Sequence, residues 1–143
     1  MRWGIIAAMS LMGAPLAGQD HQVIHVNEPA GLPFSSATRV GNLLFLSGQI
    51  GNTPGTRQLA DTGITGQTRQ IFENIKTVLA TAGSSLERVV KCTVFLTNIA
   101  DYQAMNAVYA SYFPKDPPAR STVAGSGLAL GARVEIECIA TVG

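Results

Sequence analysis

The sequence predicts an α+β fold in which two helices pack on one face of a single mixed β-sheet. Three observations lead to this prediction: a strand pair joined by a short turn, two helix-period segments separated by a β-branched strand, and a final stretch that alternates polar and apolar residues. The expected order is strand, strand, helix, strand, helix, strand, strand, which is typical of an α+β domain. With 143 residues, 46% of them hydrophobic, the chain can build one such core.

The first 19 residues are set aside from the fold because they have the features of a secretory signal peptide. A positive start, Met1-Arg2, is followed by an apolar run and then by small residues up to Gly18. The apolar run is shorter than the ~20 residues that a membrane-spanning helix needs. We therefore expect residues 1–19 to be a cleaved leader and residues 20–143 to be a periplasmic or secreted domain. The alternatives are an uncleaved anchor or a misassigned start, and the latter would leave the protein in the cytoplasm.

Two short strands are predicted over residues 35–40 and 43–47. They flank Gly41-Asn42, which is a two-residue hairpin signal. The second strand begins with four apolar residues in a row, so we expect it to be buried on both faces. Residues 20–30 are polar and are expected to form an extended lead-in.

Two helices are predicted after this hairpin. Apolar residues recur at period 3.6 over residues 67–82, and Gly83 follows where a left-handed residue usually closes a helix. The second helix carries Met and aromatic residues at helical spacing from Tyr102 to Tyr112 and is stopped by Pro114. We interpret this stripe as core packing.

Three more strands are predicted, over residues 89–96, 120–124 and 133–142. The first is rich in β-branched residues. The last alternates with period two, so its charged residues share one face and its apolar residues share the other. The charged residues of that face are Arg133, Glu135 and Glu137.

The two cysteines, Cys92 and Cys138, fall in two of these apolar strands. Neither has a neighbour at the spacing of a metal site. We expect both to be buried free thiols. The alternative is a disulfide, which an exported protein could form if the two strands lie side by side.

Arg120 is the first candidate for a binding residue. Pro117-Pro118 keep the chain out of a helical conformation just before it. A guanidinium held in this way presents a rigid fork of donors, whose natural partner is a planar carboxylate. The alternative is a solvated surface arginine that follows a proline turn.

Five short motifs occur in register between residues 31 and 142: LSGQI (46–50), VKCTVFL (90–96), MNAVY (105–109), PARS (118–121) and VEIE (134–137). Together they resemble the RidA (YjgF) family of reactive enamine/imine deaminases. The resemblance implies a chorismate-mutase-like fold and a homotrimer with a barrel-like core, with ligand clefts between subunits. It also implies hydrolysis of 2-enamine or 2-imine acids, such as 2-aminoacrylate, to 2-oxo acids and ammonia. No metal or organic cofactor is required for that reaction.

The resemblance assigns roles by position. Arg120 matches the arginine that grips the substrate carboxylate, and Glu135 matches the glutamate that orders the attacking water. Ser47 and Asn106 match polar positions of the cleft, and Gly48 lets the backbone approach a ligand closely. Each residue also has a structural alternative. Glu135 could pair on the surface with Arg133 or Lys91. The Ser47 hydroxyl could hydrogen-bond to a backbone group at the strand end, and Asn106 could be an ordinary polar residue on the surface of its helix.

Three positions depart from the family pattern. Phe34 stands where these deaminases often carry Tyr, and Thr122 where many carry Cys; both stay in the predicted ligand-binding set. Gly51 replaces a usual Pro, which we expect to loosen a cleft-side loop. Because of these departures, a non-catalytic trimer that binds small carboxylates or proteins is the alternative function. A net charge of +1 and the lack of a catalytic pair of histidines argue against ribonuclease activity.

Overall fold

The chain is represented by a computed structural model, which describes residues 21–26 and 31–143. The predicted signal peptide, residues 1–19, lies outside these ranges. Within them, no helix combines the length and the apolar composition that crossing a membrane would require.

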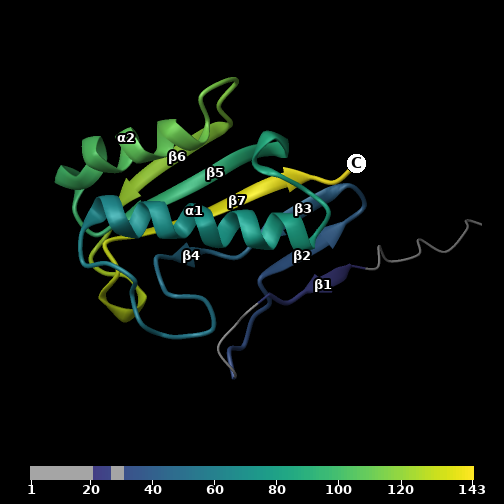
Figure 1. The fold of residues 1–143 in the computed structure, drawn as a ribbon, viewed down its shortest axis with the longest axis horizontal. Coiled ribbons are helices and arrows are strands. Elements are labelled where there is room, and N and C mark those ends of the chain that lie inside the picture. The colour runs from purple at the N-terminus through teal and green to yellow at the C-terminus, as the bar shows by residue number, and fades with distance from the viewer. Residues whose placement is uncertain (1–20, 27–30) are drawn as a thin grey trace, which may run out of the picture.

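One mixed β-sheet forms one layer of the molecule (Figure 1). Its strands are β1 (Gln22–Ile24), β2 (Ala37–Val40), β3 (Leu43–Leu46), β4 (Gln49–Ile50), β5 (Val89–Leu96), β6 (Ala119–Ala124) and β7 (Val134–Thr141). They lie in the order β1-β2-β3-β7-β5-β6, and β4 pairs with β7. Strands β5 and β6 run parallel, whereas all other pairs are antiparallel.

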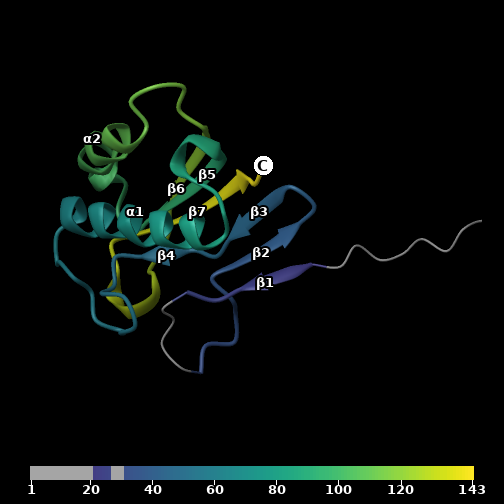
Figure 2. The ribbon, with the colours of Figure 1, turned by 45° about the vertical axis from the view of Figure 1, so that its right-hand side comes forward.

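Two α-helices, α1 (Ile64–Thr81) and α2 (Tyr102–Tyr112), lie side by side on one face of the sheet (Figures 1 and 2). The predicted fold class is therefore confirmed. Helix α1 ends as expected, because Gly83 has a φ of +76° and the Ser84 N–H donates to the Leu79 carbonyl at 2.8 Å. It begins at Ile64, earlier than predicted, and Ile64 packs against the core.

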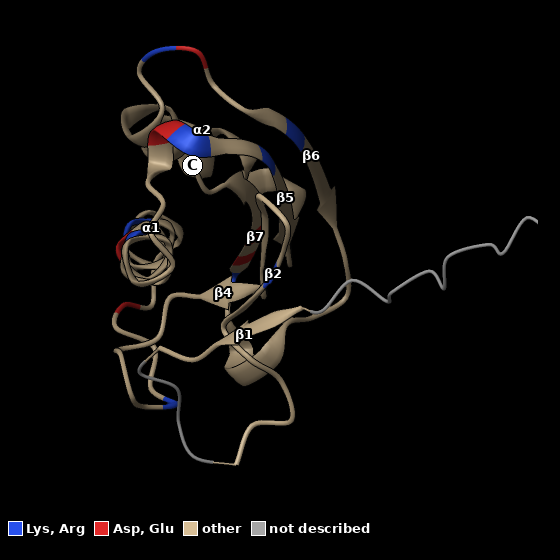
Figure 3. Ribbon diagram, turned by 90° about the vertical axis from the view of Figure 1, so that its right-hand side faces the viewer, with Lys and Arg blue, Asp and Glu red and all other residues tan. Residues whose placement is uncertain are grey.

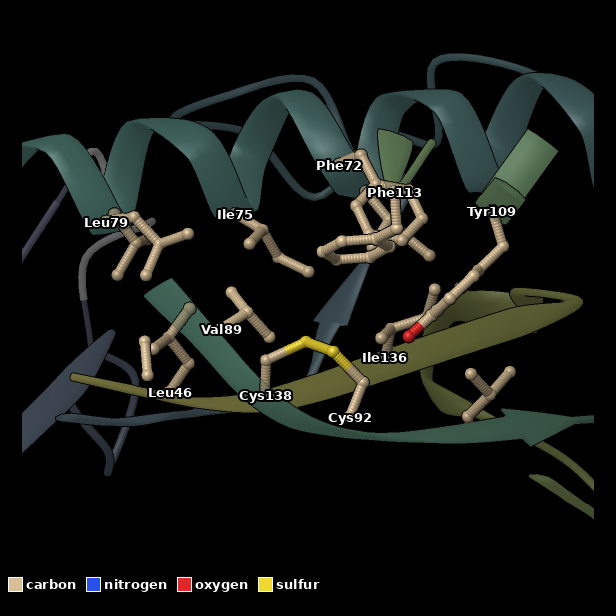
Figure 4. Packing of buried hydrophobic residues seen from close by; sticks show 14 of the residues in the cluster. Leu46, Phe72, Ile75, Leu79, Val89, Cys92, Tyr109, Phe113, Ile136 and Cys138 are labelled. Carbon is tan, nitrogen blue, oxygen red and sulfur yellow. A yellow bond between two sulfur atoms is a disulfide. The ribbon is translucent and has the colours of Figure 1, made fainter. Parts of the chain in front are cut away.

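The core lies between the sheet and the helices, and Phe72 of α1 is near its centre (Figure 4). The Phe72 ring stacks on Tyr112 with centroids 4.5 Å apart, and it meets Tyr109 and Phe113 edge-on. Met105 and Tyr109 are buried, so the aromatic stripe of α2 is indeed largely core packing.

Cys92 and Cys138 form a disulfide inside this core, so the prediction of free thiols is wrong (Figure 4). The two residues are direct partners in the antiparallel pair β5–β7, with Cα atoms 4.1 Å apart. Both side chains point toward the helices and are only 1% and 2% exposed. The strand register that brings them together is not visible in the sequence.

We expect the Cys92→Ala/Cys138→Ala variant to unfold more easily than the wild type, by about 4 kcal/mol, because the bridge restricts the unfolded chain. The two cysteines are separated by 46 residues in the sequence. Urea unfolding of both proteins, with and without reductant, measures this effect. Reductant should lower the wild-type midpoint and leave the variant unchanged. Equal midpoints for wild type and variant without reductant would mean that the bridge contributes no stability.

The other face of the sheet carries no helix (Figure 3). Leu43 and Phe45 lie on this open face and are 38% and 40% exposed, whereas Leu44 and Leu46 point into the core. The prediction that this strand is buried on both faces is therefore wrong for the single chain. Glu135 and Glu137 of β7 also lie on the open face, as the alternation predicted.

The residues around β4 pack more tightly than expected. Gly51 is buried against α1, where a Cβ atom would lie 2.8 Å from the Gln67 Cα. It is therefore a position of close packing and not a loosened loop. Strands β1 and β4 are too short to give a periodic signal, so the sequence did not predict them; β1 lies in the expected extended lead-in.

Candidate functional site

Arg120 points from β6 toward α2. Its Cα partner in β5 is Cys92, which faces the helices, so Arg120 lies on the helix-covered face of the sheet. The guanidinium carbon is 4.5 Å from the centre of the Tyr109 ring and 5.6 Å from that of Tyr102, and Nη2 donates to the Tyr102 hydroxyl at 3.1 Å. No carboxylate of the described residues pairs with it. Arg120 is thus held by aromatic rings, unlike a freely solvated surface arginine.

Tyr102 is a site residue that the sequence reasoning missed, because it was interpreted as core packing. A hydrogen bond from the Asn106 side chain and the positive charge of Arg120 hold the pKa of the Tyr102 phenol below its ordinary value. Tyr102 and Asn106 are one helical turn apart and therefore share a helix face. This spacing from Asn106, a predicted cleft residue, is the sequence signal that could have marked Tyr102 as a site residue.

Three polar atoms on this side of the molecule are buried without a hydrogen-bond partner among the described residues. They are Asn106 Oδ1, Tyr109 Oη and Thr122 Oγ1. A buried polar group without a partner costs about 1–3 kcal/mol, so such groups are uncommon unless function requires them. Asn106 therefore differs from an ordinary solvated residue on the helix surface, because its side-chain oxygen is buried. We call Asn106, Arg120 and Thr122 the arginine group.

Glu135 lies on the open face of the sheet, beside β4. Its carboxylate occupies the space where a side chain at Gly48 would begin. Partial burial, and then the negative charge of Glu137, raise the pKa of the Glu135 carboxyl above its ordinary value. Arg133 is not its partner, because the Arg133 guanidinium binds Asp101, with Nη2 2.7 Å from Oδ1.

Ser47 and Phe34 lie near Gly48. The Ser47 hydroxyl donates to the Ser35 carbonyl at 2.7 Å, which is the backbone role that was its alternative. Phe34 is 51% exposed, and with Gly48 and residues of α1 it lines a cavity of about 410 Å³, which Glu135 does not line. We call Phe34, Ser47, Gly48 and Glu135 the glutamate group.

A single chain does not bring the two groups together. Arg120 lies on the helix-covered face of the sheet, in line with Cys92 and Cys138. Glu135 lies on the open face, in line with Phe95. The arginine group offers donors for a carboxylate, and the glutamate group offers a carboxylate for proton transfer. In the described part of the chain, no three His, Cys, Asp or Glu side chains are placed to hold a metal ion.

Comparison with known proteins identifies similar chains over most of this length. Residues 25–142 match the family model described as Endoribonuclease L-PSP. The Reactive Intermediate Deaminase A of Arabidopsis thaliana chloroplasts is 43% identical over 115 residues, which are 80% of this chain and 62% of that protein. Protein DfrA of Myxococcus xanthus is 44% identical, over 76% of this chain and 84% of its own length.

Solved structures agree with the fold. RidA from an Antarctic Psychrobacter species matches with a TM-score of 0.79 and 39% identity, over 85% of this chain and 99% of that one. The YjgF gene product of E. coli matches with a TM-score of 0.77 and 33% identity, over 84% of this chain and 98% of that one.

Proposed function

Since this chain belongs to the Endoribonuclease L-PSP family, and one of its relatives is named a reactive intermediate deaminase, we propose that it is a deaminase of reactive imines. Its substrates are 2-enamine or 2-imine acids such as 2-aminoacrylate, and its products are 2-oxo acids and ammonia. The observation that carries the proposal is the Arg120 guanidinium, which is fixed by two tyrosines and has no carboxylate partner among the described residues.

In the proposed reaction the protein only positions the substrate, a water molecule and a proton, because an imine next to a carboxylate is already electrophilic. Arg120 binds the carboxylate through its fork of N–H donors and so fixes the position of C2. Glu135 takes a proton from a water molecule as the water oxygen adds to C2. Glu135 then returns that proton to the nitrogen, which gives a carbinolamine with a hydroxyl and an amino group on C2. The hydroxyl proton passes to the amino group as the C2=O bond forms and the C2–N bond breaks, so ammonia and the 2-oxo acid leave. A 2-enamine acid reacts through its 2-imine tautomer, in which one proton has moved from the nitrogen to C3. Neither a metal nor an organic cofactor is needed for these steps.

The same proposal requires that the two groups meet between copies of the chain. We expect a homotrimer in which the arginine group of one subunit faces the glutamate group of the next, with the ligand cleft between them. A head-to-tail contact of this kind closes into a ring when the rotation between neighbouring subunits divides a full turn evenly. Support comes from the open sheet face, where Leu43 and Phe45 leave apolar surface for another subunit to cover.

The proposal also includes export of the protein. We expect removal of residues 1–19 and a periplasmic or secreted domain of residues 20–143. Support comes from the Cys92–Cys138 bridge, because disulfides persist mainly in oxidising compartments. N-terminal sequencing of the protein recovered from the periplasm or medium should start near residue 20, and a start at Met1 would contradict export with cleavage.

A coupled assay tests the activity. An amino-acid oxidase supplies a panel of 2-imino acids, and release of ammonia or 2-oxo acid is followed above the spontaneous rate. The proposal predicts faster release with the mature protein, and the preferred member of the panel indicates the substrate class. Binding of 2-oxobutyrate without any acceleration would instead support the non-catalytic carboxylate-binding trimer.

Gly48→Ala is expected to lower kcat/KM by about 10- to 100-fold, because a Cβ atom there would displace the Glu135 carboxylate and small misplacements of catalytic groups are costly. Gly125→Ala is the matched control, since a Cβ atom at that position has no neighbour within 4 Å. Both variants should unfold at the wild-type temperature within a few degrees. Equal activity of the two variants would show that the space beside Glu135 is not needed.

A further inference from the structure

The Arg120 guanidinium is held at two points by α2, and the two contacts restrict different motions. The ring of Tyr109 lies 4.5 Å from the guanidinium carbon. A cation–π contact depends mainly on the distance between the charge and the ring, so it leaves the fork free to rotate within its own plane. The hydrogen bond from Nη2 to the Tyr102 hydroxyl removes that rotation, because it fixes one donor of the fork. Tyr102 therefore determines which edge of the guanidinium faces away from α2.

Tyr102 is itself well anchored. The Asn106 side chain, one turn later in α2, is placed so that it lowers the pKa of its phenol. The residue before it, Asp101, is buried and binds the Arg133 guanidinium through both carboxylate oxygens, at 2.7 and 2.9 Å from Nη2. This ion pair ties the start of α2 to the start of β7. The phenol is thus fixed relative to the sheet that carries Arg120.

We propose that Tyr102 is a positioning residue that holds the Arg120 guanidinium ready to bind a carboxylate. The inference rests on the proposed function, because it deepens the role given there to Arg120. The remaining N–H donors of Arg120 have no partner among the described residues, so they are the ones that a carboxylate meets. An arginine side chain has many rotamers, and ordering it before the ligand arrives removes part of the entropy cost of binding.

The test compares Tyr102→Phe with Tyr112→Phe. The first change removes the hydroxyl that holds Arg120 and keeps the ring. The second removes a hydroxyl of the same helix that donates to Glu73 at 2.9 Å and does not touch Arg120. Both changes delete one phenolic hydroxyl of α2 and keep the ring, so they are matched.

We expect Tyr102→Phe to raise the Kd of 2-oxobutyrate and the KM of the imino acid by about 3- to 10-fold, which is the usual cost of ordering one long side chain when the ligand binds. Its kcat should stay within about twofold of wild type, because the carboxylate is held equally before and in the transition state. Tyr112→Phe should match the wild type in both quantities. Equal values for the two variants would overturn the inference, and so would a fall in kcat at unchanged KM.

A double-mutant cycle asks whether the hydroxyl acts through the guanidinium. Adding Tyr102→Phe to Arg120→Ala should change kcat/KM by less than about twofold, because the group that Tyr102 positions is absent. The same loss in both backgrounds would overturn the inference.

Turnover and 2-oxobutyrate binding by the wild type distinguish failure of this inference from failure of the proposed function. Binding of 2-oxobutyrate without turnover would overturn the proposed deaminase and leave Tyr102 to be judged by the Kd values. Normal turnover with no effect of Tyr102→Phe would overturn only the role of Tyr102. A wild type that neither binds nor turns over would overturn both.

Discussion

Arg120→Ala is expected to lower kcat/KM for 2-imino acids by about tenfold to several hundredfold, because a hydrogen bond to a charged group contributes roughly 1.5–3 kcal/mol and a bidentate contact more. The protein should stay folded, since the Arg120 side chain is only partly buried and lies on an edge strand. Arg120→Lys should also be poor, because one ammonium does not reproduce the fork. Steady-state kinetics in the coupled assay measure both variants.

Arg39→Ala is the control for the loss of an arginine. The Arg39 Nε atom donates to the Gly41 carbonyl on the exposed hairpin turn, so its removal should leave activity unchanged. A folded Arg120→Ala protein with wild-type activity would contradict the assignment of Arg120.

Glu135→Gln is expected to lower kcat by about 10²- to 10⁴-fold, which is the usual contribution of a positioned general base. The amide keeps the size of the side chain beside Gly48 but does not accept the proton of water. Binding of 2-oxobutyrate should change little, because Arg120 holds the carboxylate. A Glu135→Gln protein with wild-type kcat would show that another group activates the water.

The pH dependence of activity is a second test of Glu135 as the general base. Burial and Glu137 raise the pKa of Glu135 above its ordinary value of 4.5. The base works only when ionised, so wild-type activity should fall as the pH drops through this raised pKa. Glu137→Gln removes a negative neighbour and should therefore move the acid limb to lower pH. An acid limb that stays in place in the Glu137→Gln variant would argue against Glu135 as the titrating group.

Those parts of the fold that local sequence determines were predictable. The period of α1, the hairpin at Gly41 and the alternation of β7 each depend on neighbours within a few residues, and the structure confirms all three. Parts that depend on pairing between distant segments were not. The Cys92–Cys138 bridge and the short strand β4 both follow from the register of β7, which no local pattern specifies.

The candidate site shows the same limit. The residues Arg120 and Glu135 could be singled out from proline stiffening, strand alternation and the family resemblance. That they lie on opposite faces of the sheet depends on how β6 and β7 pair with β5, which the sequence alone does not specify. The contact between Tyr102 and Arg120 likewise joins a helix to a strand 18 residues away. The sequence shows only that Tyr102 shares a helix face with Asn106, and not that its hydroxyl binds an arginine.

Mixed oligomers test most directly whether the site is divided between copies. Arg120→Ala chains and Glu135→Gln chains, carrying different tags, are produced together and purified through both tags. Purification through both tags leaves trimers that contain both kinds of chain, and in a head-to-tail ring of this kind about a third of the interfaces combine an intact arginine with an intact glutamate. Activity should therefore return to a similar fraction of wild type. Mixed oligomers no more active than either variant alone would contradict a site built between subunits.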